Sequence, residues 1–156
     1  MSLRTNVKEY IMPDDLKALE RRFFDEMLNQ GNVDAGDDLF AEHSVDYAGF
    51  PGQGPGRDGF KQAVRMMHAA FPDIHYTIED MIAEGDRIAT RWTLQGTHRS
   101  AFLGVPPTGK QVSVEGIHIL RFEDGMVVEC WEVWDQLSLL RQLGAAPTQE
   151  TSASGG

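Results

Sequence analysis

The sequence predicts an α+β domain in which a curved antiparallel or mixed sheet is wrapped around N-terminal helices. Apolar residues recur at helical spacing in the first half of the chain, and from Ile74 onward the period falls towards two, as strands require. A length of 156 residues with 41% hydrophobic residues suits one domain with one core. We therefore predict a single domain over residues 14–144, an N-terminal extension over 1–13 and a disordered C-terminal tail over 145–156.

Three helices are predicted before most of the sheet. The first begins near residue 14 and ends at Gly31, and its apolar stripe consists of Leu16, Leu19, Phe23 and Met27. A shorter helix is expected over residues 33–40. The third covers residues 57–70, where apolar side chains again recur at helical spacing before Phe71-Pro72 ends the helix.

Five strands are expected to pack on these helices. A short one covers residues 45–48, and the segment FPGQGPGRDG that follows it contains too many glycines and prolines for a regular element. This glycine-rich segment is either a lid over a cavity or a plain connector into the next helix. Two strands cover residues 74–83 and 88–97, and the last two form a hairpin over residues 110–134 that leads into a short helix.

The turn of this hairpin decides which side chains share a face, because a shift of one residue sends a whole set to the opposite side. Asp124-Gly125 marks the turn. If the loop contains only these two residues, His118 lies on the opposite face from Glu132. We favour a three-residue loop, 123–125, with a glycine bulge, which places His118 opposite Cys130 and diagonal to Glu132. The other members of that face would be Val114, Leu120, Val128 and Trp134.

Glu132 is the strongest candidate for a catalytic group. It lies between two tryptophans on a strand that is apolar on both faces, and burial there would raise the pKa of Glu132 towards the working pH, which is the tuning that a general base needs. The alternative is a structural salt bridge to an arginine such as Arg91. His118 alone would be an ordinary hydrogen-bonded core residue, but beside Glu132 it completes a titrating pair inside a pocket. Asp135 precedes the last helix and is well suited to cap it.

Composition argues against several kinds of partner. A formal charge of −10 disfavours binding to nucleic acids and to anionic membranes, and no apolar run approaches the ~20 residues of a spanning helix. The histidines show no metal-ligand spacing, so we predict no metal. The lone Cys130 fits a reducing compartment, so a cytoplasmic location is expected. We expect the Cys130 side chain to pack in the core rather than to act as a nucleophile.

A family resemblance is carried by five segments: FFDEMLNQGNVDAGDDLFAEHSVDY, GPGRDGFKQAVRMMHAAFPD, GTHRSAFLGVPPTGKQV, GIHILRFEDGMVVECWEVWDQ and LLRQLG. Over about residues 14–144 the chain resembles the SnoaL-like polyketide cyclases, or ester cyclases, of the nuclear transport factor 2-like superfamily. The resemblance implies a cone-shaped fold around an apolar pocket and ring closure by intramolecular aldol condensation without cofactor or metal. The family's essential aspartate falls at Glu132, its pocket histidine at His118 and a substrate-binding glutamine at Gly116.

The leading hypothesis is a cofactor-independent enzyme that acts on a small or polycyclic, polyketide-like carbonyl compound. Glu132 removes a proton next to the carbonyl and His118 donates to the developing enolate, giving a new carbon–carbon bond or a shifted double bond. The expected substrate contacts are Trp92, Trp134, Tyr47, Asp135, Phe102 and Gly116. Two alternatives are an epoxide or ester hydrolase with the same fold, and a non-catalytic protein that binds a small molecule.

Assembly is predicted from the outer face of the hairpin. Its side chains Ile117, Ile119, Trp131 and Val133 are too apolar to face water, and the helices can cover only one side of the sheet. We expect a homodimer or a higher homo-oligomer through this face, as the family resemblance also implies.

Overall fold

The N-terminal half is mainly helical in the computed structural model, which describes residues 11–146. Helix α1 (Pro13–Arg22) continues into a π-helical segment, η1 (Phe23–Asn29). A 3-10 turn, η2 (Val33–Ala35), leads into the short helix α2 (Gly36–Leu39), and α3 covers Gly56–Ala70. These segments agree closely with the three predicted helices. The predicted N-terminal extension and C-terminal tail lie for the most part outside the described residues.

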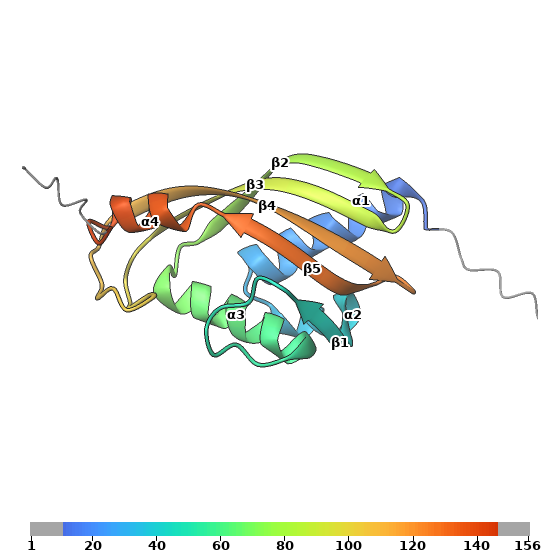
Figure 1. Cartoon of the computed structure of the whole chain (residues 1–156), viewed down its shortest axis with the longest axis horizontal. Coiled ribbons are helices and arrows are strands. Elements are labelled where there is room, and N and C mark those ends of the chain that lie inside the picture. The colour runs from blue at the N-terminus through green and yellow to red at the C-terminus, as the bar shows by residue number, and fades with distance from the viewer. Residues whose placement is uncertain (1–10, 147–156) are drawn as a thin grey trace, which may run out of the picture.

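Five strands form one mixed sheet in the described part of the chain: β1 (Phe40–Asp46), β2 (His75–Glu84), β3 (Arg87–Thr97), β4 (Gln111–Glu123) and β5 (Met126–Trp134). Their order is β1-β5-β4-β3-β2, with β1 parallel to β5 and all other neighbours antiparallel. The sheet curves over α1 and α3, and α4 (Gln136–Gln142) follows β5 (Figure 1). The predicted α+β class, with a bent sheet wrapped around helices, is confirmed.

Strand β1 begins earlier than predicted. It starts at Phe40, which is fully buried, instead of at residue 45, and its pairing with β5 is irregular between Phe40 and Val45. Glu42 and His43 in this stretch are exposed, so the segment lacks the regular alternation that identifies a strand in a sequence.

The hairpin between β4 and β5 has a different turn from the one predicted. Glu123 pairs with Met126, so the loop contains only Asp124 and Gly125, whose φ values of 51° and 76° match the positive φ values of a type I′ turn. Aspartate tolerates this left-handed backbone better than most residues. The prediction of a three-residue loop is therefore wrong.

A bulge further along the hairpin places His118 and Glu132 on the same face of the sheet, although the turn is shorter than predicted. Phe122 pairs with Val127 but Arg121 pairs with Glu129, which leaves Val128 as the extra residue. Beyond it His118 pairs directly with Glu132, so the two side chains share the concave face as predicted. Because of the bulge, Val127 takes the buried place on this face that was expected for Val128.

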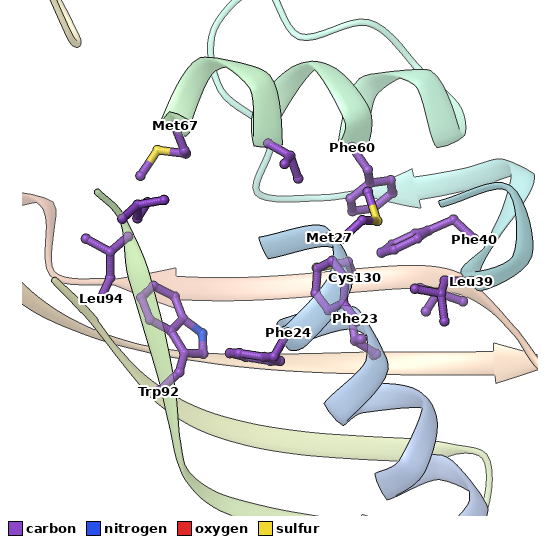
Figure 2. Close-up of a cluster of buried hydrophobic side chains, with 14 of the residues drawn as sticks. Phe23, Phe24, Met27, Leu39, Phe40, Phe60, Met67, Trp92, Leu94 and Cys130 are labelled. Atoms are coloured by element: carbon purple, nitrogen blue, oxygen red, sulfur yellow. The ribbon is translucent and has the colours of Figure 1, made fainter. Parts of the chain in front are cut away.

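The hydrophobic core lies between the concave face of the sheet and the helices. Side chains from η1, β1 and α3 meet side chains from β3 and β5 there (Figure 2). Phe23 packs edge-on against Phe40, and Phe40 lies 4.4 Å from Phe60 between ring centroids. None of the helices within residues 11–146 is both long and apolar enough to cross a lipid bilayer.

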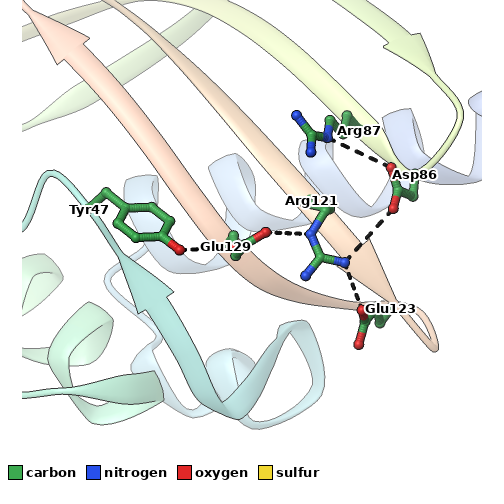
Figure 3. A network of polar contacts seen from close by, with 6 residues as sticks. All are labelled: Tyr47, Asp86, Arg87, Arg121, Glu123 and Glu129. Atoms are coloured by element: carbon green, nitrogen blue, oxygen red, sulfur yellow. Dashed lines mark hydrogen bonds and ion pairs between the residues drawn. The ribbon is translucent and has the colours of Figure 1, made fainter.

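The convex face of the sheet combines an ionic network with exposed apolar side chains. Arg121 contacts Glu129, Glu123 and Asp86, and the hydroxyl of Tyr47 donates to Glu129 (Figure 3). Beside this network Ile117 is 51% exposed and Val133 is 80% exposed. The helices do not cover this face.

Candidate active site

A cavity lies inside the concave face of the sheet. It is walled by α3, η1, residues of all five strands and two residues of the glycine-rich segment, Phe50 and Gln53. Its volume is about 90 Å³. One water takes about 10–15 Å³ on this measure, so the room suffices for about six to nine waters. The walls are mostly aromatic and aliphatic, with a few polar side chains among them: Asp46, Gln53, His68, Tyr76, His118 and Glu132.

The glycine-rich segment forms part of the cavity wall. The side-chain oxygen of Gln53 accepts from the backbone N–H of Phe50 at 3.0 Å, and its amide donates to Asp46 at 2.9 Å. Phe50 in turn packs edge-on against Trp134. The segment therefore closes one side of the cavity, which supports the lid interpretation over that of a plain connector.

Glu132 and His118 meet on the floor of this cavity. Nδ1 of His118 lies 3.7 Å from Oε2 of Glu132. The side chain of Glu132 is 29% exposed, whereas that of His118 is only 3% exposed. Glu132 is thus the partner that a small molecule in the cavity can touch. The alternative pairing with Arg91 does not occur, because Arg91 binds Asp80 on the outside of the sheet at 2.6 Å.

Glu20 is the functional residue that the sequence analysis missed. It lies on α1, is completely buried, and its carboxylate binds Nε2 of His118. The signal was present in the sequence, since Glu20 lies four residues after Leu16 and three before Phe23, in the middle of the apolar stripe. A charged residue at such a position is rarely buried without a partner.

His118 is therefore held between two carboxylates. Burial on its own lowers the pKa of His118, but the charges and hydrogen bonds of Glu20 and Glu132 outweigh burial and raise the pKa to about 10. His118 is thus an imidazolium at neutral pH. Nε2 is bonded to Glu20, Nδ1 faces Glu132 at 3.7 Å, and the ring is flanked by Phe23 and Phe24. Donation from His118 to a developing enolate therefore stays a prediction, and Nδ1 is the nitrogen that would make it.

Two of the expected substrate contacts, Trp92 and Trp134, line the cavity. They flank Gly116 in one row across strands β3, β4 and β5. A Cβ atom at Gly116 would lie 2.3 Å from Cζ2 of Trp92 and 2.8 Å from Cβ of Trp134. The Trp92 indole therefore fills the space that a longer side chain would take at this position, and Gly116 acts by allowing this packing rather than by facing the cavity.

The other three expected contacts do not line the cavity. Tyr47 stacks on Trp131 on the convex face, with 5.2 Å between ring centroids, because β1 turns its side chain outward. Phe102 is buried behind the wall, against Phe50 and Trp134. Asp135 accepts from the backbone N–H of Ser138 at 2.9 Å and caps α4, as predicted from its place before that helix.

Cys130 also lines the cavity, as a thiol rather than a thiolate. Burial, followed by the negative charges of Glu132, Asp46 and Glu20, raises the pKa of the Cys130 thiol well above its ordinary value. A nucleophilic role for Cys130 is therefore disfavoured. Within residues 11–146 we find no group of three or more histidine, cysteine or acidic side chains that could hold a metal ion.

Comparison with known proteins identifies the family. Residues 18–143 match the model of the SnoaL-like polyketide cyclases. The chain belongs to this family. It is 33% identical over 97 residues to aklanonic acid methyl ester cyclase DnrD of Streptomyces peucetius, an alignment that covers 61% of this chain and 67% of the relative. It is 32% identical over 90 residues to nogalonic acid methyl ester cyclase of Streptomyces nogalater, with 57% and 67% covered.

Solved structures agree with this assignment. TsrD from Streptomyces laurentii superposes with a TM-score of 0.81 at 29% identity, covering 86% of this chain and 98% of TsrD. IdmH from Streptomyces antibioticus superposes with a TM-score of 0.70 at 32% identity, covering 82% of this chain and 97% of IdmH. The fold and the family are thus the ones that the sequence resemblance implied.

Proposed function

We propose that the protein is a cofactor-independent cyclase in which Glu132 is the catalytic acid/base. The observation that carries this proposal is the position of Glu132, a carboxylate that remains partly exposed inside a mostly apolar cavity. A carboxylate at such a place can remove a proton from a carbon atom next to a carbonyl, because few water molecules compete for it.

The proposed reaction is an intramolecular aldol addition. The Glu132 carboxylate takes the proton, and the electron pair of the C–H bond moves into the enolate. The enolate carbon then attacks a second carbonyl carbon of the same molecule, which forms the new carbon–carbon bond and an alkoxide. Protonated Glu132 returns the proton to this alkoxide, so that the product is an isomer of the substrate and the enzyme is regenerated.

In this mechanism His118 and Glu20 do not touch the substrate, and they act through their contacts with each other and with Glu132. The buried Glu20 carboxylate keeps His118 charged, and the imidazolium in turn faces Glu132 at 3.7 Å. This contact places a positive charge beside the Glu132 carboxylate. We assign His118 and Glu20 as positioning residues and Glu132 as the residue that touches the substrate.

The proposed substrate is a carbonyl compound of the polyketide type. The relatives named above act, by their names, on the methyl esters of aklanonic and nogalonic acid. The cavity here measures about 90 Å³, below the ~300–1,000 Å³ of pockets that enclose drug-sized ligands. Its size favours a small ketone, or the reacting end of a larger molecule, as the group bound beside Glu132.

The test compares three proteins on three substrates. Wild type, Glu132→Gln and Glu129→Gln are incubated with aklanonic acid methyl ester, nogalonic acid methyl ester and the small diketone heptane-2,6-dione. Glu129→Gln is the matched control, since it makes the same substitution on the same strand but on the outer face, where Glu129 binds Arg121. Chromatography should detect ring closure with wild type and Glu129→Gln, and background rates with Glu132→Gln.

Other outcomes contradict the proposal. An equally active Glu132→Gln variant would remove Glu132 from the mechanism. Formation of free acids without ring closure would favour the ester hydrolase, and binding of all three compounds without any product would favour the non-catalytic binding protein.

We also propose that the protein forms a homodimer through the convex face of the sheet. Support comes from the exposed apolar side chains Ile117, Ile119 and Val133 beside Trp131. Light scattering at micromolar concentration should give the mass of a dimer, and Val133→Lys should give a monomer. A monomeric wild type would contradict the proposal. The free, buried Cys130 supports a cytoplasmic location.

A further inference from the structure

The proposed mechanism lacks a hydrogen-bond donor for the enolate oxygen. An enolate that forms in an apolar cavity needs such a donor, because the developing negative charge would otherwise be left without solvation. His118 is assigned above to the support of Glu132, with its Nε2 bonded to Glu20 and its Nδ1 3.7 Å from Glu132. His68 is bonded to the backbone oxygen of Leu28 at 2.6 Å, and Gln53 holds Asp46 and Phe50.

Tyr76 lies on β2 and lines the same cavity as Glu132. Its ring packs edge-on against Phe24, with 6.1 Å between centroids, and against Trp92 at 5.4 Å. Its backbone is fixed to Asn29 by two hydrogen bonds, from the Tyr76 N–H at 2.7 Å and to the Tyr76 oxygen at 3.0 Å. The ring is thus held in place before any ligand binds, which is the condition for an effective electrostatic donor.

The Tyr76 hydroxyl is an uncommitted, neutral donor. Its side chain makes no hydrogen bond to any of the residues that the structure describes; the bonds of Tyr76 are those of its backbone. Burial, and after it the negative charge of Glu132, raise the pKa of the phenol far above its ordinary value. The hydroxyl therefore keeps its proton at every pH at which the enzyme would work, and it lies within electrostatic range of Glu132.

We propose that Tyr76 is a second catalytic residue, the donor that binds the carbonyl oxygen of the substrate and stabilises the enolate. This inference rests on the proposed function and deepens it. Glu132 takes the proton from carbon while the Tyr76 O–H bond stays intact and donates to the oxygen on which the charge develops. When the carbon–carbon bond forms, that oxygen returns to a carbonyl and the hydrogen bond weakens again.

The chemical class of ligand follows from this pair. A substrate must present a carbonyl oxygen to Tyr76 and an acidic C–H group on the adjacent carbon to Glu132. Enolisable ketones and β-dicarbonyl compounds meet this requirement. Esters or epoxides that lack an acidic C–H group do not.

The test uses 1-indanone, a two-ring ketone with enolisable hydrogens, and indane, the same hydrocarbon without oxygen. Binding is measured by ligand-observed NMR for wild type, Tyr76→Phe and Tyr47→Phe. Tyr47→Phe is the matched control, because it makes the same substitution on the convex face, where the Tyr47 hydroxyl donates to Glu129. We expect Tyr76→Phe to bind 1-indanone about 2- to 13-fold more weakly than wild type and to bind indane equally well. Tyr47→Phe should retain the preference for the ketone.

Infrared spectra of bound 1-indanone distinguish a hydrogen bond from Tyr76 to the ligand from a purely structural role of Tyr76, because a structural role would not change the carbonyl frequency. The carbonyl band should shift to lower frequency on wild type and return towards its value in an apolar solvent on Tyr76→Phe. Exchange of the α-hydrogens of 1-indanone in D₂O should slow by about 10²–10³-fold in this variant. Its thermal unfolding should match that of wild type, since the lost hydroxyl has no protein partner.

The outcomes separate this inference from the proposed function. If wild type and Tyr76→Phe give the same affinity and the same carbonyl band, Tyr76 is not the donor, although catalysis by Glu132 can still hold. The same is true if Tyr47→Phe loses the preference for the ketone as much as Tyr76→Phe does. If wild type binds neither 1-indanone nor indane, the cavity is not a ligand site, and the proposed function and the role of Tyr76 are both overturned.

Discussion

The buried pair of Glu20 and His118 makes the stability of the protein depend on pH in a specific way. The pKa of His118 rises from the ordinary 6.5 to about 10 in the folded state. At about 1.4 kcal/mol per pH unit, this difference corresponds to roughly 5 kcal/mol of native-state stability. Because the folded pKa is the higher one, the stabilisation is complete below pH 6.5 and is lost as pH rises towards 10.

Between pH 7 and pH 9 the wild type should therefore lose about 2–3 kcal/mol from its free energy of unfolding. For a domain of this size the loss corresponds to a fall of about 4–12 °C in Tm. Cys130 adds to the fall above about pH 8 and Tyr76 only near pH 10 and above, since the pKa of each is raised in the folded state and the loss begins near the ordinary pKa of each group. A variant that keeps both residues but lacks the Glu20 charge is needed to isolate the contribution of His118.

Glu20→Gln provides that comparison. Breaking a buried ion pair leaves His118 without its fully buried counter-charge, so we expect a loss of about 3–5 kcal/mol at pH 6–7. The difference from wild type should shrink as pH rises towards 10, because His118 progressively loses its proton in wild type as pH approaches its pKa of about 10. Urea denaturation followed by tryptophan fluorescence at pH 6, 7, 8 and 9 measures both curves. If the difference between the two proteins is the same at every pH, Glu20 does not hold a proton on His118 and the reasoning fails.

Three further predictions concern single residues. Glu132→Gln should change the free energy of unfolding by no more than about 1 kcal/mol, because Glu132 is partly exposed; a loss of several kcal/mol in urea titration would make it a structural residue. Gly116→Ala should cost about 1–3 kcal/mol and change the fluorescence of Trp92, because the new methyl group meets the indole; an unchanged melt would contradict this packing. Asp135→Ala should lower the free energy of unfolding by about 0.5–2 kcal/mol through loss of the helix cap, and it should leave the binding of 1-indanone unchanged. Weaker binding of 1-indanone would indicate that Asp135 contacts the ligand.

The fold could be predicted from the sequence because its signals are local. The apolar stripes of α1 and α3 and the alternation of β3 and β4 depend on spacing alone. The register of the last hairpin depends on two local features that a sequence does not distinguish. A two-residue turn and a bulge at Val128 together give the same shared face for His118 and Glu132 as a three-residue turn would, with a direct pair in place of a diagonal one.

The site could be predicted only in part because it joins distant segments. Glu132 and His118 lie on neighbouring strands, so their pairing followed from the hairpin. Glu20 reaches His118 across 98 positions of sequence, and Tyr76 enters the cavity from the far edge of the sheet. Tyr47 was expected to contact the substrate and was placed within the predicted strand 45–48, but β1 ends at Asp46, and the irregular pairing of this edge strand with β5 could not be predicted from the sequence.

The exchange of α-hydrogens on a bound ketone tests the central claim most directly. It needs no knowledge of the natural substrate, since it measures only whether Glu132 takes a proton from carbon. Wild type in D₂O should replace the α-hydrogens of 1-indanone faster than buffer, and Glu129→Gln should do the same. Glu132→Gln should bind 1-indanone but exchange at the rate of buffer. Exchange by Glu132→Gln at the wild-type rate, or no enzymatic exchange by a wild type that binds the ketone, would contradict the assignment of Glu132 as the catalytic base.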